Sequence, residues 1–187
     1  MTLLEMKKKV LGLIEELNPQ SELLTDDPDI AAKINDVINM KLFELARMKK
    51  IPKYVEFEVK EGELIDFSRI EKESGYEVYQ VMTAKGVACE FLAQGSLIKA
   101  FESGTMCVEF YIYPERITEK TKDKAYEFEL TPDALEIMPF GVAGDLLKSD
   151  VSSSYGQIYS SEYENQKTQL DSRYNMASIS IEGGVYI

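Results

Sequence analysis

Residues 135–166 read LEIMPFGVAGDLLKSDVSSSYGQIYSSEYENQ, and this stretch decides the fold. Its apolar residues recur every three or four positions, which predicts two consecutive helices that are separated at Asp150. Aspartate is a favourable helix N-cap, so we expect Asp150 to cap a long helix over about residues 151–177. The two helices should form one side of a helical body.

The first of these helices has a clear beginning and an internal proline. Thr131 is expected to cap it, with Pro132 in its first helical position. Pro139 is expected to kink or restart the helix, because proline lacks a backbone donor. The glycines of GVAGD, residues 141–145, are expected to allow close helix packing. They do not match a phosphate-binding glycine motif, and no such motif occurs elsewhere in the sequence.

Tyrosines line one face of the second predicted helix. Tyr155, Tyr159 and Tyr163 are four residues apart, and Leu170 and Tyr174 continue the same stripe. One interpretation is a bundle core in which the hydroxyl groups reach the edge. The other is a seam between identical subunits, because tyrosine is enriched at interfaces. Both interpretations can hold in an oligomer.

The segment before these helices has a different periodicity. Residues 53–130 contain short runs with alternating apolar side chains, separated by turns at Gly86, Gly95 and the SGT of residues 103–105. The run KAYEFELT, residues 124–131, closes the series. The pattern predicts a small antiparallel sandwich or meander.

Helical periodicity also begins the chain. An apolar stripe over residues 3–17 predicts a first helix, and Asp26 or Asp27 with Pro28 predicts the start of a second. The predicted fold class is therefore α+β: a helical bundle from both chain ends, an inserted small antiparallel β-domain and an extended C-terminal tail. The corresponding boundaries are residues 1–52 and 131–178 for the bundle, 53–130 for the β-domain and 179–187 for the tail.

The C-terminal tail reads SISIEGGVYI over residues 178–187 and is strand-like. A helix that points outward would carry it away from the bundle. It could pair with the inserted β-domain, but addition as a strand to a different chain is favoured. Its apolar residues are Ile179, Ile181, Val185, Tyr186 and Ile187.

Composition bounds the possible functions. The length of 187 residues favours one domain, and 33 acidic against 21 basic residues give a net charge of -12. Such a surface should let DNA pass without binding it, because binding requires a basic stripe that neutralises phosphates. No apolar run approaches the length of a membrane span, and the N-terminus does not have the pattern of a signal peptide.

The sequence offers little catalytic chemistry. It has no histidine, which removes serine–histidine and cysteine–histidine dyads and histidine metal ligands. Cys89 and Cys107 match no zinc spacing and are expected to be reduced, buried thiols. We therefore expect no enzyme activity, cofactor or metal. A lower-ranked alternative is an enzyme with an Asp/Tyr site near Tyr113 and Asp145, and a third is a cytosolic module that binds a peptide or protein by strand addition.

The order of motifs over about residues 107–170 resembles the head-to-tail adaptor (connector) proteins of tailed bacteriophages. A strand ending Tyr-x-x-Pro is followed by an Ile-Thr pair, a YEFEL strand, a proline-containing helix, an LL…D helix end and a helix rich in Tyr and Glu. The matching residues are Tyr111, Pro114, Ile117, Thr118, Tyr126, Phe128, Leu130, Pro139, Leu146, Leu147, Asp150, Tyr155, Tyr159 and Tyr163.

The resemblance implies a structural role in the virion neck, between capsid and tail. It also implies that the protein is in the host cytoplasm while the virion assembles. Family members form a homo-oligomeric ring, typically of twelve copies, that docks beneath the portal protein and extends the DNA channel. The ring offers a platform for a stopper, tail-terminator or tail protein. The family also uses a C-terminal segment to grip the portal, which would give residues 179–187 their partner. The sizeable insert at residues 53–130 departs from the shortest family members.

Overall fold

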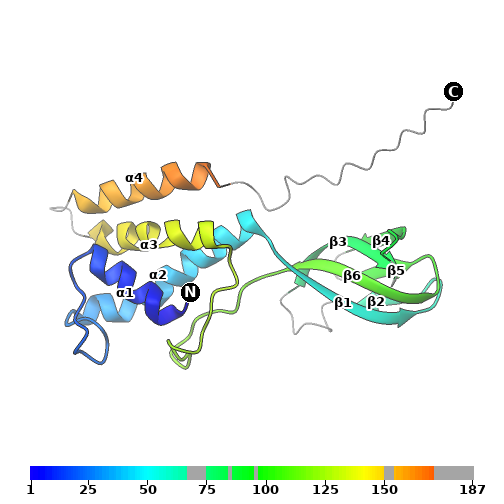
Figure 1. Ribbon diagram of the computed structural model, residues 1–187, viewed down its shortest axis with the longest axis horizontal. Helices are drawn as coiled ribbons and strands as arrows, with labels where there is room; N and C mark the ends of the chain where they lie inside the picture. Colours follow the sequence, from blue (N-terminus) through cyan, green and yellow to red (C-terminus); the bar gives the residue numbers. More distant parts are fainter. Residues whose placement is uncertain (67–74, 84–85, 95–96, 150–153, 171–187) are drawn as a thin grey trace.

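The computed structural model describes residues 1–66, 75–83, 86–94, 97–149 and 154–170. They form a mixed α+β structure, as the sequence predicted, with helices gathered at one end of an elongated molecule and strands at the other (Figure 1). The helices are α1 (Leu3–Leu13), α2 (Pro28–Lys49), α3 (Pro132–Leu146) and α4 (Tyr155–Thr168), with a short 3-10 turn η2 (Leu147–Ser149). The strands are β1 (Ile51–Val59), β2 (Leu64–Asp66), β3 (Gly75–Thr83), β4 (Phe91–Gln94), β5 (Leu97–Ala100) and β6 (Gly104–Ile112).

The first two helices begin at side-chain caps. Thr2 and Glu5 form a reciprocal capping box at the start of α1. Asp27, one of the two predicted caps, accepts hydrogen bonds from the backbone amides of Asp29 and Ile30, and Pro28 occupies the first turn of α2. These caps satisfy amide groups that have no partner within the helix.

Helix α3 begins where the sequence predicted and continues through its internal proline. Thr131 is the N-cap residue and Pro132 follows it, as predicted, although the Thr131 side chain makes no capping hydrogen bond. The helix continues through Pro139 to Leu146 and does not restart. Pro139 is buried, so packing of the surrounding apolar residues compensates for the backbone hydrogen bond that proline cannot make.

The strands form two small antiparallel sheets. The first has the order β1-β6-β3, and the second has the order β2-β5-β4. Strands β1 and β6 pair along their full length, from Ile51 opposite Ile112 to Val59 opposite Gly104. The chain enters the sheets through β1, directly after α2, and leaves them at the end of β6. These two points are adjacent because Ile51 pairs with Ile112. Ile98 and Ala100 of the second sheet belong to the same hydrophobic cluster as Val108 of the first.

The connector, residues 113–130, returns from β6 to α3 along the helices (Figure 1). The sequence predicted a strand of the β-domain over residues 124–131, but the structure places this segment against α1. Glu127 forms an isolated bridge with Thr2, and the amide of Phe128 donates to the carbonyl of Met1. The predicted strand is therefore wrong: within the described chain, the segment that contains Tyr126, Phe128 and Leu130 has a single bridge, and its partner is the N-terminus.

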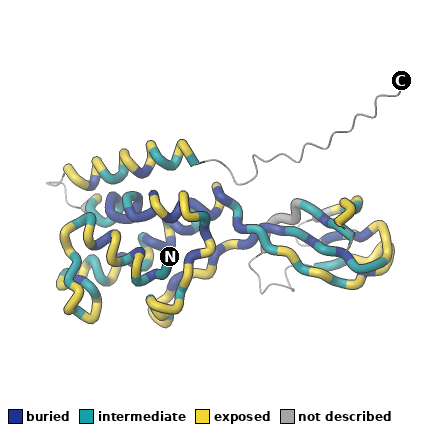
Figure 2. The backbone as a smooth tube through the Cα atoms, in the orientation of Figure 1, coloured by how far each residue is buried: buried dark blue, intermediate teal, exposed yellow. Residues whose placement is uncertain are grey.

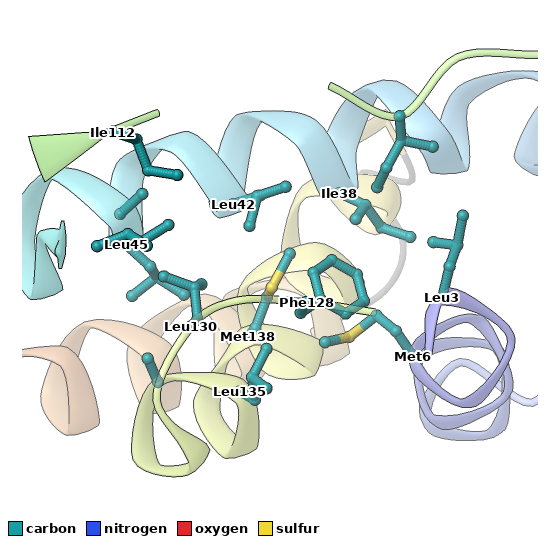
Figure 3. Close-up of a cluster of buried hydrophobic side chains, with 14 of the residues drawn as sticks. Leu3, Met6, Ile38, Leu42, Leu45, Ile112, Phe128, Leu130, Leu135 and Met138 are labelled. Carbon is teal, nitrogen blue, oxygen red and sulfur yellow. The ribbon is translucent and has the colours of Figure 1, made fainter. Parts of the chain in front are cut away.

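The core joins the helices and the connector. Figure 3 shows Phe128 and Leu130 of the connector beside Ile38 and Leu42 of α2 and Met138 of α3. All five side chains are buried, and the backbone tube shows the same dark centre among the helices (Figure 2). Burial of side chains of this kind stabilises a fold by about 1.5–3 kcal/mol each before the entropy of ordering is subtracted.

Candidate functional site

Helices α3 and α4 form a closely packed hairpin at the surface of the helical part. A Cβ atom built on Gly144 would lie 2.5 Å from Ser160 Oγ and 2.9 Å from the Ser160 amide nitrogen. On α4, Gly156 lies against Leu147, with 3.1 Å between a built Cβ and the leucine Cβ. The expected role of the glycines in residues 141–145 is confirmed, because side chains there would push the helices apart.

The tyrosines of α4 differ in how far they are buried. Tyr163 is 1% exposed and belongs to the core, whereas Tyr155 is 62% exposed. Tyr159 lies between them, and its hydroxyl donates a 2.7 Å hydrogen bond to the carbonyl of Leu13. The rings of Tyr155 and Tyr159 stack with centroids 6.4 Å apart. One stripe therefore combines a core anchor at Tyr163 with an exposed aromatic surface at Tyr155.

Charged side chains surround the ring of Tyr163. The ammonium groups of Lys41 and Lys167 lie 4.7 Å and 4.9 Å from its centroid, on α2 and α4 respectively. Lys167 also forms a 2.6 Å ion pair with Glu44. Burial, and then the negative charge of Glu44, raise the pKa of Tyr163. This hydroxyl therefore stays protonated, and it has no hydrogen bond of good geometry to a described residue even though Glu44 is close.

Asp145, which the enzyme hypothesis selected, belongs with Lys41, Glu44 and Lys167 to a group of charged side chains between α2, α3 and α4, here called the polar layer. Asp145 pairs with Lys41 at 3.1 Å and with Lys148. Desolvation alone would raise the pKa of Asp145, but hydrogen bonds from Lys148 and Lys41 outweigh it and lower that pKa. Tyr113 lies elsewhere, with its ring 6.1 Å from that of Phe43. Lys41 and Phe43 are two residues apart on α2 and face different sides, so these contacts do not bring Asp145 and Tyr113 together.

A groove opens where four helix ends meet. It has a volume of about 370 Å³, and the turn after α1, the start of α2, the end of α3 and the start of α4 all contribute to it. Apolar walls come from Leu13, Ile14, Ile30, Leu146 and Leu147, together with Tyr155 and Tyr159. The charged residues of its lining are Glu15, Glu16, Asp27, Asp29 and Lys33. Sequence reasoning linked Tyr155 to a seam but missed this groove, because its walls come from segments far apart in the chain.

Several predicted site residues lie at or beyond the end of the described chain. Leu170 is half-buried and packs against the core cluster. Helix α4 ends at Thr168, so it is shorter than the predicted helix over residues 151–177. Asp150, Tyr174 and the predicted docking residues lie outside the described residues. Those docking residues are Ile179, Ile181, Val185, Tyr186 and Ile187.

The described residues offer neither a metal site nor a membrane-spanning helix. No group of three or more Cys, Asp or Glu side chains in them could hold a metal ion. None of their helices combines the length and apolarity needed to cross a bilayer. Cys89 and Cys107 are free and only partly buried. Desolvation and neighbouring glutamates raise the pKa of both thiols, which disfavours the reactive thiolate.

The sequence matches no protein-family model, and a search of curated proteins found no significant match.

Proposed function

We propose that this chain is a structural subunit of a head-to-tail adaptor ring in the neck of a tailed-phage virion. One observation carries the proposal: α4 holds Tyr163 in the core and displays Tyr155 and Ile158, which are 62% and 55% exposed. Exposed large apolar side chains on a helix anchored in this way are typical of an interface between subunits. In this role Tyr155 and Ile158 contribute to the seam, and Tyr163 positions the helix that carries them.

The arrangement of the chain supports the same role. In the proposal, helices from both chain ends form the body of each subunit, and the β-domain is an insert that reaches a neighbouring neck component. The pairing of the start of β1 with the end of β6 supports this division of the chain. Because these two ends are adjacent, the β-domain joins the helical body at a single place. A closed ring then repeats the seam, so that modest contacts per copy hold the assembly together.

The partners follow from the two ends of the proposed ring. Residues 179–187 dock on the portal protein as an added strand, and the opposite side of the ring receives a stopper, tail-terminator or tail protein. The net charge of -12 suits a channel that lets DNA pass without holding it. This role requires no catalysis or cofactor, and the protein would move from the host cytoplasm into the virion during assembly.

The portal test uses native mass spectrometry and cryo-EM on the full chain with and without portal protein from the same source. We expect closed rings on the portal. A chain that ends before Ser178 should remain folded, by circular dichroism, and should not bind the portal. Unchanged binding by the truncated chain would remove the tail from the proposal, and an intact chain indifferent to portal would contradict the adaptor role.

The seam is tested separately by Tyr155→Ser with Ile158→Ser. Both side chains are mostly exposed, so the variant should unfold at nearly the same urea concentration as the wild type while ring formation is lost. A matched control is Leu64→Ser with Leu92→Ser on the β-sheets, where the two side chains are 63% and 58% exposed. Rings that form normally with the α4 variant would contradict a seam at this helix.

The second candidate is a cytosolic module that binds a peptide or protein by strand addition. The observation in its favour is that the two small sheets end at edge strands, β1 and β3 in one and β2 and β4 in the other. Edge strands present unpaired backbone groups that an extended peptide can use. A stable monomer that binds short extended peptides and ignores portal would favour this candidate.

A further inference from the structure

We propose that the loop of residues 118–124 from one copy of this chain docks in the groove between the helix ends of the next copy. The inference rests on the proposed ring and names the contact that would close it. It depends on two surfaces of the same chain that carry opposite charge, lie apart and are each incompletely neutralised within one subunit.

The groove is lined by both apolar and acidic side chains. Its charged lining residues are four carboxylates and a single cation, Lys33, among the residues that the structure describes. The Asp27 carboxylate is occupied as the cap of α2. Glu15, Glu16 and Asp29 form no ion pair with any described residue, so the groove retains negative charge that a partner could neutralise.

The loop is basic in a chain that is strongly acidic overall. Its lysines, Lys120, Lys122 and Lys124, are exposed and make no ion pair within the described part of the chain. Asp123 is already paired with Lys7 at 2.8 Å, which leaves Glu119 as the acid within the loop that opposes these lysines. The loop therefore has the charge that the groove lacks.

Local hydrogen bonds hold the loop in a defined shape. The amide of Thr121 donates to the carbonyl of Thr118, and the amide of Ala125 donates to that of Lys122. The hydroxyl of Tyr126 donates a 2.6 Å hydrogen bond to the carbonyl of Glu115 and closes the base of the loop. A loop that is ordered before contact loses less entropy on docking than a loose one. Figure 1 shows it projecting beside the helices, and Figure 2 shows its exposed tip.

In the proposed contact the loop and the groove belong to different copies. The Lys7–Asp123 pair ties the loop to the first half of α1, whereas the groove begins at Leu13, at the far end of that helix. Six residues of helix separate these points by about 9 Å along the axis. A contact between unlike surfaces is heterologous, and heterologous contacts generate rings when their rotation closes. Lysine ammonium groups would meet the groove carboxylates and the exposed face of Tyr155.

The test is charge reversal followed by rescue. Glu15→Lys with Glu16→Lys reverses part of the charge of the groove, and Lys120→Glu with Lys122→Glu reverses that of the loop. Each double variant alone should weaken self-association in low salt by about tenfold or more, measured by sedimentation equilibrium. Reversing both in one chain, or mixing the two variants in equal amounts, should restore it. Glu90→Lys with Glu102→Lys, in the loops before β4 and after β5, gives the same charge change as the groove variant away from both surfaces and should not weaken association.

Three outcomes would overturn the inference: a wild-type chain that stays monomeric in low salt, reversals without effect, or reversals that weaken association without rescue. The portal experiment separates this inference from the adaptor proposal. A chain that binds portal while charge reversal leaves its self-association unchanged keeps the adaptor role and excludes the loop–groove contact. Rescue by paired reversal in a chain that ignores portal supports the contact and contradicts the adaptor role.

Discussion

The ring of Tyr163 lies directly over Gly141: a Cβ atom added to Gly141 would be 2.8 Å from Cδ2 and 2.9 Å from Cε2 of the tyrosine. The ring is almost fully buried, so it has no room to retreat. This contact sets how closely α4 can approach α3, and α4 carries the exposed Tyr155. The smallest residue in one helix therefore positions the proposed seam on the other.

Replacing this glycine should destabilise the protein. In Gly141→Ala the added methyl group overpacks the Tyr163 ring, and we expect a net loss of about 1–3 kcal/mol of unfolding free energy in urea denaturation. Gly12→Ala in α1 is the matched control, because a built Cβ meets nothing within 4 Å there. That control should gain up to about 1 kcal/mol from helix propensity. Equal effects at the two positions would mean that the hairpin is not tightly packed.

The ring of Tyr163 should contribute much more to the free energy of unfolding than its hydroxyl group. Tyr163→Phe keeps the apolar contacts and the cation–π contacts with Lys41 and Lys167, and removes a hydroxyl without a well-formed hydrogen bond. We expect its unfolding free energy to stay within about 1 kcal/mol of the wild type or to rise. Tyr163→Ala should lose about 3–5 kcal/mol through the cavity it leaves. A clearly destabilised Phe variant would show that the hydroxyl is bonded, with Glu44 as the acceptor.

The connector depends on one buried amide. Asn39 Nδ2 donates a 2.8 Å hydrogen bond to the carbonyl of Ile117, and the amide of Ile117 donates a 2.9 Å bond to Asn39 Oδ1. Asn39→Leu fills similar space but leaves both backbone groups of Ile117 without this partner. We expect a loss of about 2–4 kcal/mol in urea denaturation, because each buried unsatisfied group costs about 1–3 kcal/mol. The net value of one hydrogen bond is about 1 kcal/mol. A loss smaller than about 1 kcal/mol would mean that water satisfies the backbone groups of Ile117 in place of the Asn39 side chain.

Acid should weaken the polar layer between α2, α3 and α4. Desolvation opposes ionisation of Glu44 and Asp145, but hydrogen bonds from lysines outweigh it and lower both pKa values in the folded protein. Their stabilising contribution is therefore present above the unfolded pKa values of about 4 and is lost as pH falls below them. Thermal melts should show Tm falling from about pH 5 to pH 3.

Asp145→Asn tests this assignment. The variant has no carboxylate to protonate at this position, so its Tm should fall less steeply with acid than that of the wild type. At neutral pH it should be less stable, because Lys41 and Lys148 lose an ionised partner. An unchanged acid slope would place the pH dependence in other carboxylates.

Local signals in the sequence predicted the element types well. Asp26 or Asp27 with Pro28 marked the start of α2, Thr131 and Pro132 marked that of α3, and the glycines of residues 141–145 indicated close packing. These are effects of neighbouring residues on the backbone, so a sequence displays them directly. The α+β class followed from the change of periodicity after Pro52.

Long-range relationships were beyond the reach of the same signals. Residues 124–131 alternate as a strand does, but periodicity does not name a partner, and Glu127 bridges Thr2 at the other end of the chain. Pro139 was expected to kink or restart α3, and the helix does not restart there, because the surrounding packing keeps it continuous. The groove was missed for a related reason: Glu15 and Tyr155 both line it because the helix ends meet, and the spacing of the tyrosine row does not indicate which segment lies opposite.

The pairing of Ile51 with Ile112 has a practical consequence for the strands between them. Opposite residues in antiparallel strands have Cα atoms about 4.5–5.5 Å apart, so a two-residue turn could join the two positions directly. Both isoleucines would remain to fill the helical core beside Leu45, as Figure 3 shows for Ile112. The segment from Pro52 to Tyr111 is therefore a natural point for an exchange experiment: a two-residue turn there would remove the strands, and would also remove the Lys53–Glu129 ion pair and the contact of Lys50 with the Tyr111 ring.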